Sequence, residues 1–199
     1  MIYWIGRFWL ALFGWQLAGE TRIPDKCVFI AAPHTSNWDL PFTLATAYVL
    51  GVRIAWLGKS TLFSGVCGRF LRALGGVPVD RSGPRNMVEQ ISSTFRASET
   101  LILVVPPEGT RAKADYWKSG FYHIGRRAGV PIGLGFLDYQ RRLCGIGGFV
   151  IPSGDMKADM DKVRDFYANI RGKYPNKESI PRLREEDEVP VEMISLPGS

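Results

Sequence analysis

CVFIAAPHTSNWD, residues 27–39, reads as a buried strand that gives way to a polar turn and then to a helix. Residues 27–32 are continuously apolar rather than alternating, which is typical of a strand covered on both faces. Ser36 and Asp39 have the spacing of a capping box, in which two side chains begin a helix. A strand followed at once by a helix is the repeating unit of an α/β fold.

The same alternation continues outward from this stretch. Similar apolar segments predict four further strands, the last two joined as a hairpin: 53–58, 100–106, 131–139 and 142–150. The segments between them predict helices over 37–50, 61–74, 84–97 and 120–128. From Met156 to Ile170, apolar residues recur at steps of three and four, which predicts one more amphipathic helix. We therefore expect a single-domain α/β fold with a mostly parallel sheet flanked by helices.

Length and composition agree with one folded domain. The chain has 199 residues, of which 46% are hydrophobic and 22% charged, and these values argue against disorder and against a polytopic membrane protein. Its three cysteines have no C-x-x-C spacing, so a reducing compartment fits better than a disulfide framework. Because only two histidines are present, we expect no metal site.

The net charge of +6 is unevenly placed along the chain. Residues 1–154 carry 17 Lys and Arg against 9 Asp and Glu, whereas residues 155–199 carry 8 against 10. A basic body is compatible with anionic lipid, nucleic acid or phosphorylated small molecules. No nucleic-acid-binding motif accompanies the charge, so we do not expect nucleic acid as a partner.

The first twenty residues, MIYWIGRFWLALFGWQLAGE, are far richer in aromatic side chains than the rest of the chain. Their uninterrupted apolar run, from Phe8 to Trp15, is short of the roughly 20 residues that span a bilayer. The segment also lacks the basic start and small-residue cleavage site of a signal peptide. We predict an amphipathic interfacial helix over residues 1–20, with residues 1–18 on the membrane lipid surface. The alternative is a helix packed on the protein's own core.

His34 falls just past the carboxyl end of the strand at 27–32, at the edge where open α/β sheets place their sites. Because Ser36 and Asp39 begin the following helix, His34 and Asp39 are expected to lie close together. A carboxylate beside an imidazole fixes its tautomer and favours the imidazolium, which suits a general base for a hydroxyl. Taken alone, the pair is also compatible with a loop histidine and a helix-end carboxylate that complements the helix dipole.

Two further motifs carry a resemblance to a known family. LGGVPVDRSG occupies residues 74–83 and VVPPEGTRAK residues 104–113. Together with the H-x-x-x-x-D pair, they make the sequence resemble the glycerophospholipid acyltransferases, which include the lysophosphatidate acyltransferases. The family's four blocks appear in order, and the likeness covers about residues 25 to 140. The blocks are His34–Asp39, Gly75–Arg81, Pro107–Arg111 and Val130–Pro131.

The resemblance implies transfer of a fatty acyl group in phospholipid biosynthesis. The donor would be acyl-CoA or acyl carrier protein, the acceptor a lysophospholipid-like hydroxyl of the 1-acyl-glycerol-3-phosphate type, and no cofactor would be needed. His34 would act as general base and Asp39 would orient it. The implied organisation is a membrane-interface helix at 1–20, a catalytic domain at 21–174 and an extended tail at 175–199. The protein would then be peripheral, or monotopic, on the cytoplasmic face of a membrane.

The resemblance also implies how the substrates are bound. Arg81 would hold the acceptor's phosphate, although it is also compatible with a surface pair to Asp80. Glu108 would either hydrogen-bond a substrate or anchor Arg111 as a buried ion pair. The expected substrate-binding residues are Gly75, Arg81, Glu108, Gly109, Thr110, Arg111 and Lys118.

Three departures from the family pattern widen the choice of acceptor. Pro106 replaces an aromatic residue, Pro78 interrupts the second block, and Gly133–Gly135 lack the fourth block's usual second proline. Transfer to a different lipid acceptor therefore stays open, as does hydrolysis of a thioester or ester by the same His34. A non-enzymatic, peripheral lipid-binding protein is a further alternative.

Overall fold

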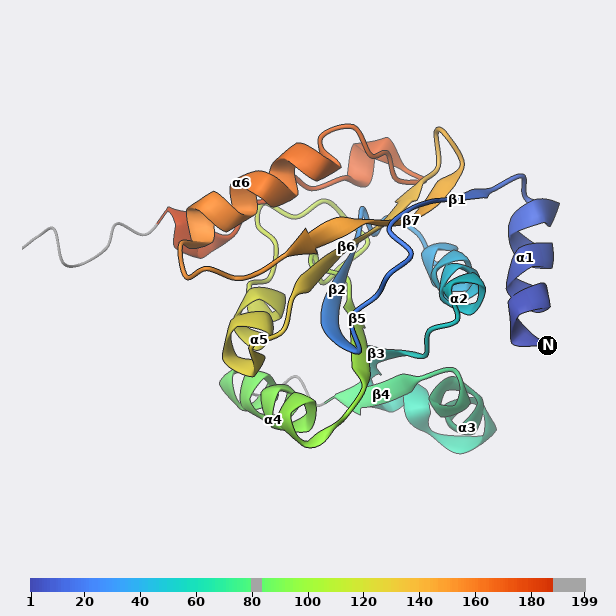
Figure 1. Ribbon diagram of the computed structural model, residues 1–199, viewed down its shortest axis with the longest axis horizontal. Coiled ribbons are helices and arrows are strands. Elements are labelled where there is room, and N and C mark those ends of the chain that lie inside the picture. Colours follow the sequence, from blue (N-terminus) through green and yellow to red (C-terminus); the bar gives the residue numbers. More distant parts are fainter. Residues whose placement is uncertain (80–83, 188–199) are drawn as a thin grey trace, which may run out of the picture.

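The apolar segments of the sequence form one mixed sheet between two layers of helices (Figure 1). The computed structural model describes residues 1–79 and 84–187, and within these residues the sheet has seven strands in the order β1-β7-β6-β2-β5-β3-β4. All neighbouring strands are parallel except β6 and β7, which pair antiparallel. The predicted α/β architecture with a mostly parallel sheet is confirmed.

All five predicted strands are present, each within one residue at either end. They are β2 (Lys26–Ala32), β3 (Ile54–Lys59), β5 (Leu101–Val105), β6 (Ile132–Asp138) and β7 (Leu143–Val150). Two four-residue edge strands, β1 (Gln16–Gly19) and β4 (Gly76–Val79), were not predicted. They complete the two edges of the sheet.

The path of the chain through the sheet divides the helices between its faces. The chain runs from β2 outward to β3 and β4, then returns to β5 and on to β6. Right-handed crossovers put helices of the outward and return paths on opposite faces. Accordingly α2 (Asp39–Leu50) and α3 (Gly65–Ala73) lie on one side, and α4 (Pro84–Ala97) and α5 (Gly120–Ala128) lie on the other (Figure 1).

The predicted helices match these elements, with three differences. The second helix begins at Asp39, two residues later than predicted, and a 3-10 turn, η1 (Ser60–Phe63), replaces the start of the helix predicted from residue 61. α6 (Met156–Tyr167) ends before Ile170 and joins α4 and α5 on their face of the sheet (Figure 1).

Each face of the sheet has its own core, which explains the continuous apolar character of β2. Val28 and Ile30 face α5 and α6, where they pack in a cluster that includes Phe121 and Met160. Cys27 and Phe29 face the opposite side and belong to a second cluster. Because successive strand residues point to opposite faces, a strand between two helical layers needs apolar residues at every position.

The N-terminal helix is shorter than predicted. α1 covers Ile2–Leu12, and Gln16–Gly19 forms β1, which pairs with β7 instead of extending the helix to residue 20. α1 packs on α2 through Gly6, at which a Cβ would lie 2.6 Å from the carbonyl oxygen of Ala45. Most of its large apolar side chains remain exposed, among them Ile2, Trp4, Ile5, Phe8 and Leu12. No helix within residues 1–79 and 84–187 has the length and hydropathy of a membrane span.

The extended tail predicted for 175–199 is wrong for the part that the structure describes. Two 3-10 turns, η2 (Pro175–Lys177) and η3 (Arg184–Glu186), fold residues 175–187 back onto the body. Leu183 is fully buried and bridges to Trp117, and Glu186 pairs with Arg164 of α6 at 2.7 Å. One buried leucine and one partly buried ion pair therefore anchor a segment whose prolines and acidic residues indicated an extended tail. Residues 188–199 lie outside the described residues.

Candidate active site

The His34–Asp39 motif and the Pro107–Arg111 motif lie at the carboxyl ends of two adjacent parallel strands. Residues Pro33 and His34 follow β2, and the Pro107–Arg111 turn follows β5, whose Val105 is level with Ile30. The chain leaves β2 toward one face of the sheet and β5 toward the other. A site between strands whose connections diverge in this way is the usual ligand position in open α/β sheets.

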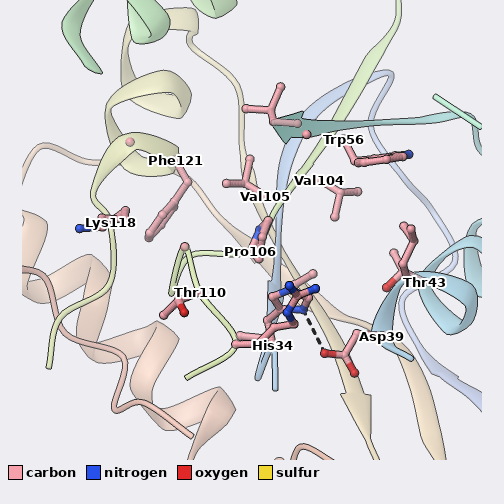
Figure 2. Close-up of a pocket in the computed structure, with 18 of the residues that line it drawn as sticks. His34, Asp39, Thr43, Trp56, Val104, Val105, Pro106, Thr110, Lys118 and Phe121 are labelled. Carbon is pink, nitrogen blue, oxygen red and sulfur yellow. Dashed lines mark hydrogen bonds and ion pairs between the residues drawn. The ribbon is translucent and has the colours of Figure 1, made fainter. Parts of the chain in front are cut away.

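Asp39 lies at the centre of a hydrogen-bond network. Its Oδ2 is 3.0 Å from His34 Nδ1 and accepts the backbone N–H of Ser36, also at 3.0 Å (Figure 2). The Ser36 hydroxyl accepts the Trp38 N–H at 3.1 Å, so this turn is held from both ends, much as in a capping box. The predicted proximity of His34 and Asp39 is confirmed.

Tyr139 completes the network and was not predicted as a site residue. Its hydroxyl donates to Asp39 Oδ1 at 2.8 Å, from the position directly after β6. Its ring packs edge-on against Trp15, with centroids 4.9 Å apart. Burial, and next the neighbouring Asp39 charge, raise the pKa of Tyr139 well above its usual range, so it remains a proton donor to the carboxylate.

Glu108 supports the loop that carries His34. It is only 3% exposed, and its Oε1 accepts the backbone N–H of His34 at 2.9 Å. Its Oε2 has no hydrogen-bond partner among the described residues. Burial raises the pKa of Glu108 to about 7, against the opposing effect of the His34 hydrogen bond.

The ion pair between Glu108 and Arg111, one of the two alternatives for Glu108, is not formed. Arg111 is exposed and donates to the side-chain oxygen of Asn37, whereas Glu108 points into the body toward His34. Glu108 therefore lies beneath the turn, and Arg111 lies on its surface.

The turn that follows β5 is tightly held. Gly109 has a φ of +68°, which strongly favours glycine, and its N–H donates to Pro106 O at 3.2 Å. The Thr110 hydroxyl accepts the N–H of Ala112 at 3.2 Å. Lys118 is tied to the same turn because its N–H donates to Pro107 O at 2.7 Å.

A cavity of about 2000 Å³ opens beside His34 and has two chemically different arms. Figure 2 shows Thr43, Trp56 and Val104 on one side of His34, and Thr110 and Lys118 on the other. The first side, which we call the apolar arm, continues to Leu62 and Leu71. The second, the cationic arm, is lined by Arg111, Lys118, His123, Arg126, Arg127 and Lys177. His123 lies 3.7 Å from Glu185 there, and Arg127 pairs with Glu89 at 2.9 Å.

The sequence profile of the Acyltransferase family matches residues 15–133, which include both the His34–Asp39 pair and the Pro107–Arg111 turn. The chain belongs to the acyltransferase family. A solved structure with a similar fold is the 1-acyl-sn-glycerophosphate (LPA) acyltransferase PlsC from Thermotoga maritima, with a TM-score of 0.52 and 19% identity over 81% of this chain and 73% of that one. A search of curated protein sequences returned no significant match.

Among the described residues, two of the predicted binding residues of this acyltransferase, Gly75 and Glu108, do not line the cavity. Gly75 is not among the lining residues; it precedes β4 with a φ of +84°, and a Cβ there would lie 2.0 Å from Ile54 O. Its part in the second block is therefore to allow a close turn. Arg81, the predicted phosphate ligand, and its possible partner Asp80 lie outside the described residues.

The cysteines of this acyltransferase lie outside the cavity. Cys27 and Cys144 are buried, and burial raises the pKa of both thiols, that of Cys27 to about 12. Cys67 is exposed on α3 and is not a lining residue. Among the described side chains, no group of three or more His, Cys, Asp or Glu is placed to hold a metal ion.

Proposed function

We propose that this acyltransferase moves a fatty acyl group from acyl-CoA or acyl carrier protein to the hydroxyl of a lysophospholipid-like acceptor, as in phospholipid biosynthesis. The observation that carries the proposal is the His34–Asp39 pair, with 3.0 Å between Nδ1 and Oδ2, at the junction of an apolar and a cationic arm of one cavity. The structural relative is a 1-acyl-sn-glycerophosphate acyltransferase, and we extend that acceptor type to this chain.

The geometry supports direct transfer with His34 as general base. Because Nδ1 faces Asp39, Nε2 is the nitrogen left for the acceptor. As the acceptor oxygen attacks the thioester carbonyl, its proton passes to Nε2, and Asp39 stabilises the imidazolium that forms. The C–S bond then breaks and the imidazolium returns the proton to the leaving sulfur. The products are an ester and a thiol, without an acyl-enzyme and without a cofactor.

The two arms suit chemically different parts of the substrates. In our proposal, acyl chains occupy the apolar arm beside Val104 and Trp56, whose indole N–H already donates to Leu74 O at 2.9 Å. Arg111 and Lys118 bind the acceptor's phosphate, because guanidinium and ammonium groups both pair with phosphate oxygens. Backbone N–H groups of the turn after Glu108 stabilise the thioester oxyanion.

We further propose peripheral association with the cytoplasmic face of a membrane through residues 1–18. The exposed aromatic side of α1, with Trp4 and Phe8, supports this because such side chains settle at the headgroup boundary. A membrane surface would also supply the lipid acceptor. The free cysteines favour the reducing side of that membrane.

A matrix of donors and acceptors tests the proposed reaction. The purified protein is given acyl-CoA or acyl carrier protein with each of several lysophospholipids, and thiol release is followed with and without the acceptor. We expect release that depends on the acceptor and yields the acylated lipid. Release without acceptor, together with free fatty acid, would instead establish a hydrolase; absence of turnover with every pair would favour a lipid-binding protein.

A further inference from the structure

The segment formed by η1 and α3 presents three of its large apolar side chains outward, although Phe63 is buried. Leu62, Val66 and Phe70 are 53%, 83% and 63% exposed and recur at steps of four residues. The residue that α3 buries is Gly68, at which a Cβ would lie 2.1 Å from Phe63 O. The helix therefore rests on its small side and leaves its apolar side uncovered. A helix of a folded domain ordinarily does the reverse.

The charged residues of the chain segment that carries this apolar face, up to Val79, are all positive. Residues 40–79 contain Arg53, Lys59, Arg69 and Arg72 and neither Asp nor Glu. Arg69 and Arg72 are exposed on α3 itself. Large apolar side chains flanked by arginine are the combination by which an interfacial helix binds an anionic bilayer.

The position of α3 connects this face to the cavity. Leu62 is exposed and also lines the apolar arm, and Leu71 of α3 lines it as well. α3 lies on the same side of the sheet as α1 and α2 (Figure 1). A bilayer on this face would therefore lie at the end of the arm that is suited to an acyl chain.

We propose that Leu62, Val66, Phe70 and Arg69, which we call the α3 patch, dock on an anionic bilayer as a membrane contact separate from α1. The docked patch opens the apolar arm toward the bilayer, so that a lipid chain enters between η1 and α3 without crossing water. A second copy of the chain fits this face less well, because a two-fold contact would bring together two copies of Arg69 and Arg72 from a segment, residues 40–79, that has no Asp or Glu to pair with them. Only the identity of the entering lipid rests on the proposed function; the docking itself does not.

Cys67 provides a direct test in the unaltered chain. It is the exposed one of the three cysteines and lies between Val66 and Phe70 on α3. A fluorophore sensitive to polarity is attached to it, and vesicles of phosphatidylcholine with or without phosphatidylglycerol are added. We expect a blue shift with the anionic vesicles and quenching by lipids brominated on their acyl chains. An unchanged spectrum on protein that floats with those vesicles would overturn the proposal.

Paired variants test whether vesicle binding depends on the α3 patch or on exposed apolar side chains in general. Val66→Ser/Phe70→Ser is compared with Ile151→Ser/Ile180→Ser, which removes two apolar side chains that are 77% and 70% exposed elsewhere. We expect the first variant to partition into anionic vesicles about tenfold more weakly and the second to behave as wild type. Arg69→Gln should weaken partitioning about fivefold in anionic vesicles and leave neutral ones unaffected. Equal partitioning of both paired variants would contradict the proposal, as would a dimer in solution that Phe70→Ser dissociates.

Failure of the docking proposal can be distinguished from failure of the proposed acyl transfer. Vesicle binding is measured without substrate, so an inactive protein that inserts Cys67 would leave the docking intact. Conversely, a protein that acylates lysolipid in detergent micelles but does not insert Cys67 would retain the reaction and lose the docking proposal.

Discussion

At the residue scale, Asp39 holds three groups in place at once. It meets the imidazole of His34, the N–H of Ser36 and the hydroxyl of Tyr139. The sequence predicted the first of these because five residues of a strand-to-helix turn cannot separate the side chains far, and the capping-box spacing of Ser36 and Asp39 indicated the second. It did not indicate Tyr139, which is 100 residues away and is brought to Asp39 by the pairing of β6 with β2.

Tyr139→Phe tests whether this third contact positions the pair. Loss of a hydrogen bond to a charged group should lower kcat by about tenfold and leave KM and the thermal midpoint nearly unchanged. Steady-state kinetics of acyl transfer measure the first effect and circular dichroism the second. Tyr48→Phe is the control, since its hydroxyl makes no hydrogen bond within the described part of the chain. A kcat equal to that of wild type would show that Tyr139 only fills space.

Glu108→Gln tests the buried acid beneath His34. The folded protein raises the pKa of Glu108 from 4.5 to about 7, so between these values the native state binds more protons than the unfolded state. Stability contributed at this site therefore falls as pH rises through that window. Glutamine can still accept the His34 N–H but does not ionise. We expect the free energy of unfolding of the variant, relative to wild type, to rise by up to about 3 kcal/mol between pH 4 and pH 8.

Denaturant unfolding across that pH range provides the measurement for Glu108. A difference between the two proteins that stays constant with pH would show that the acid has an ordinary pKa in the fold.

At the element scale, prediction succeeded where burial on both faces made a strand continuously apolar. The five long strands carry that signal, and their ends were correct within one residue. β1 and β4 have only four residues each, QLAG and GVPV, and form because β7 and β3 offer them an open edge. Their pairing is set by distant partners, so no local pattern could reveal it.

Gly6→Val tests the packing of α1 on α2. A Cβ at this position would lie 2.6 Å from Ala45 O, so a branched side chain would force the two helices apart. We expect a loss of about 1–3 kcal/mol in stability. Chemical denaturation measures this loss. Gly51→Ala is an unsuitable control because of its positive φ, whereas Gly120→Ala adds a Cβ in open space and should be neutral. A stable Gly6→Val protein would indicate that α1 does not pack on α2 in solution.

At the scale of the whole molecule, the site depends on the order of the strands. The sequence predicted that His34 lies at a strand end, but the neighbouring position of the Pro107–Arg111 turn follows from the insertion of β5 between β2 and β3. The role of residues 175–187 was missed for a similar reason. Their prolines and acidic residues indicated an extended tail, while their docking depends on Trp117 and Arg164 in distant parts of the chain.

Leu183→Ala tests whether that segment is part of the folded body. Leu183 is fully buried against the core that includes Trp117, so truncating it should leave a cavity and cost about 2–4 kcal/mol. Ile180→Ala, at an exposed position three residues earlier, should cost little. Thermal unfolding followed by circular dichroism compares the two. Equal midpoints would mean that residues 175–187 are not docked.

The proposed reaction is tested most directly by the lipid product itself. Wild type and His34→Ala are incubated with acyl-CoA and a 1-acyl-glycerol-3-phosphate acceptor, and the diacylated product is quantified by mass spectrometry at matched folded protein. We predict product with the wild type and a rate lower by about 10²- to 10⁴-fold in the variant, the contribution of a general base. Product formation by His34→Ala at the wild-type rate would contradict the role assigned to the imidazole beside Asp39.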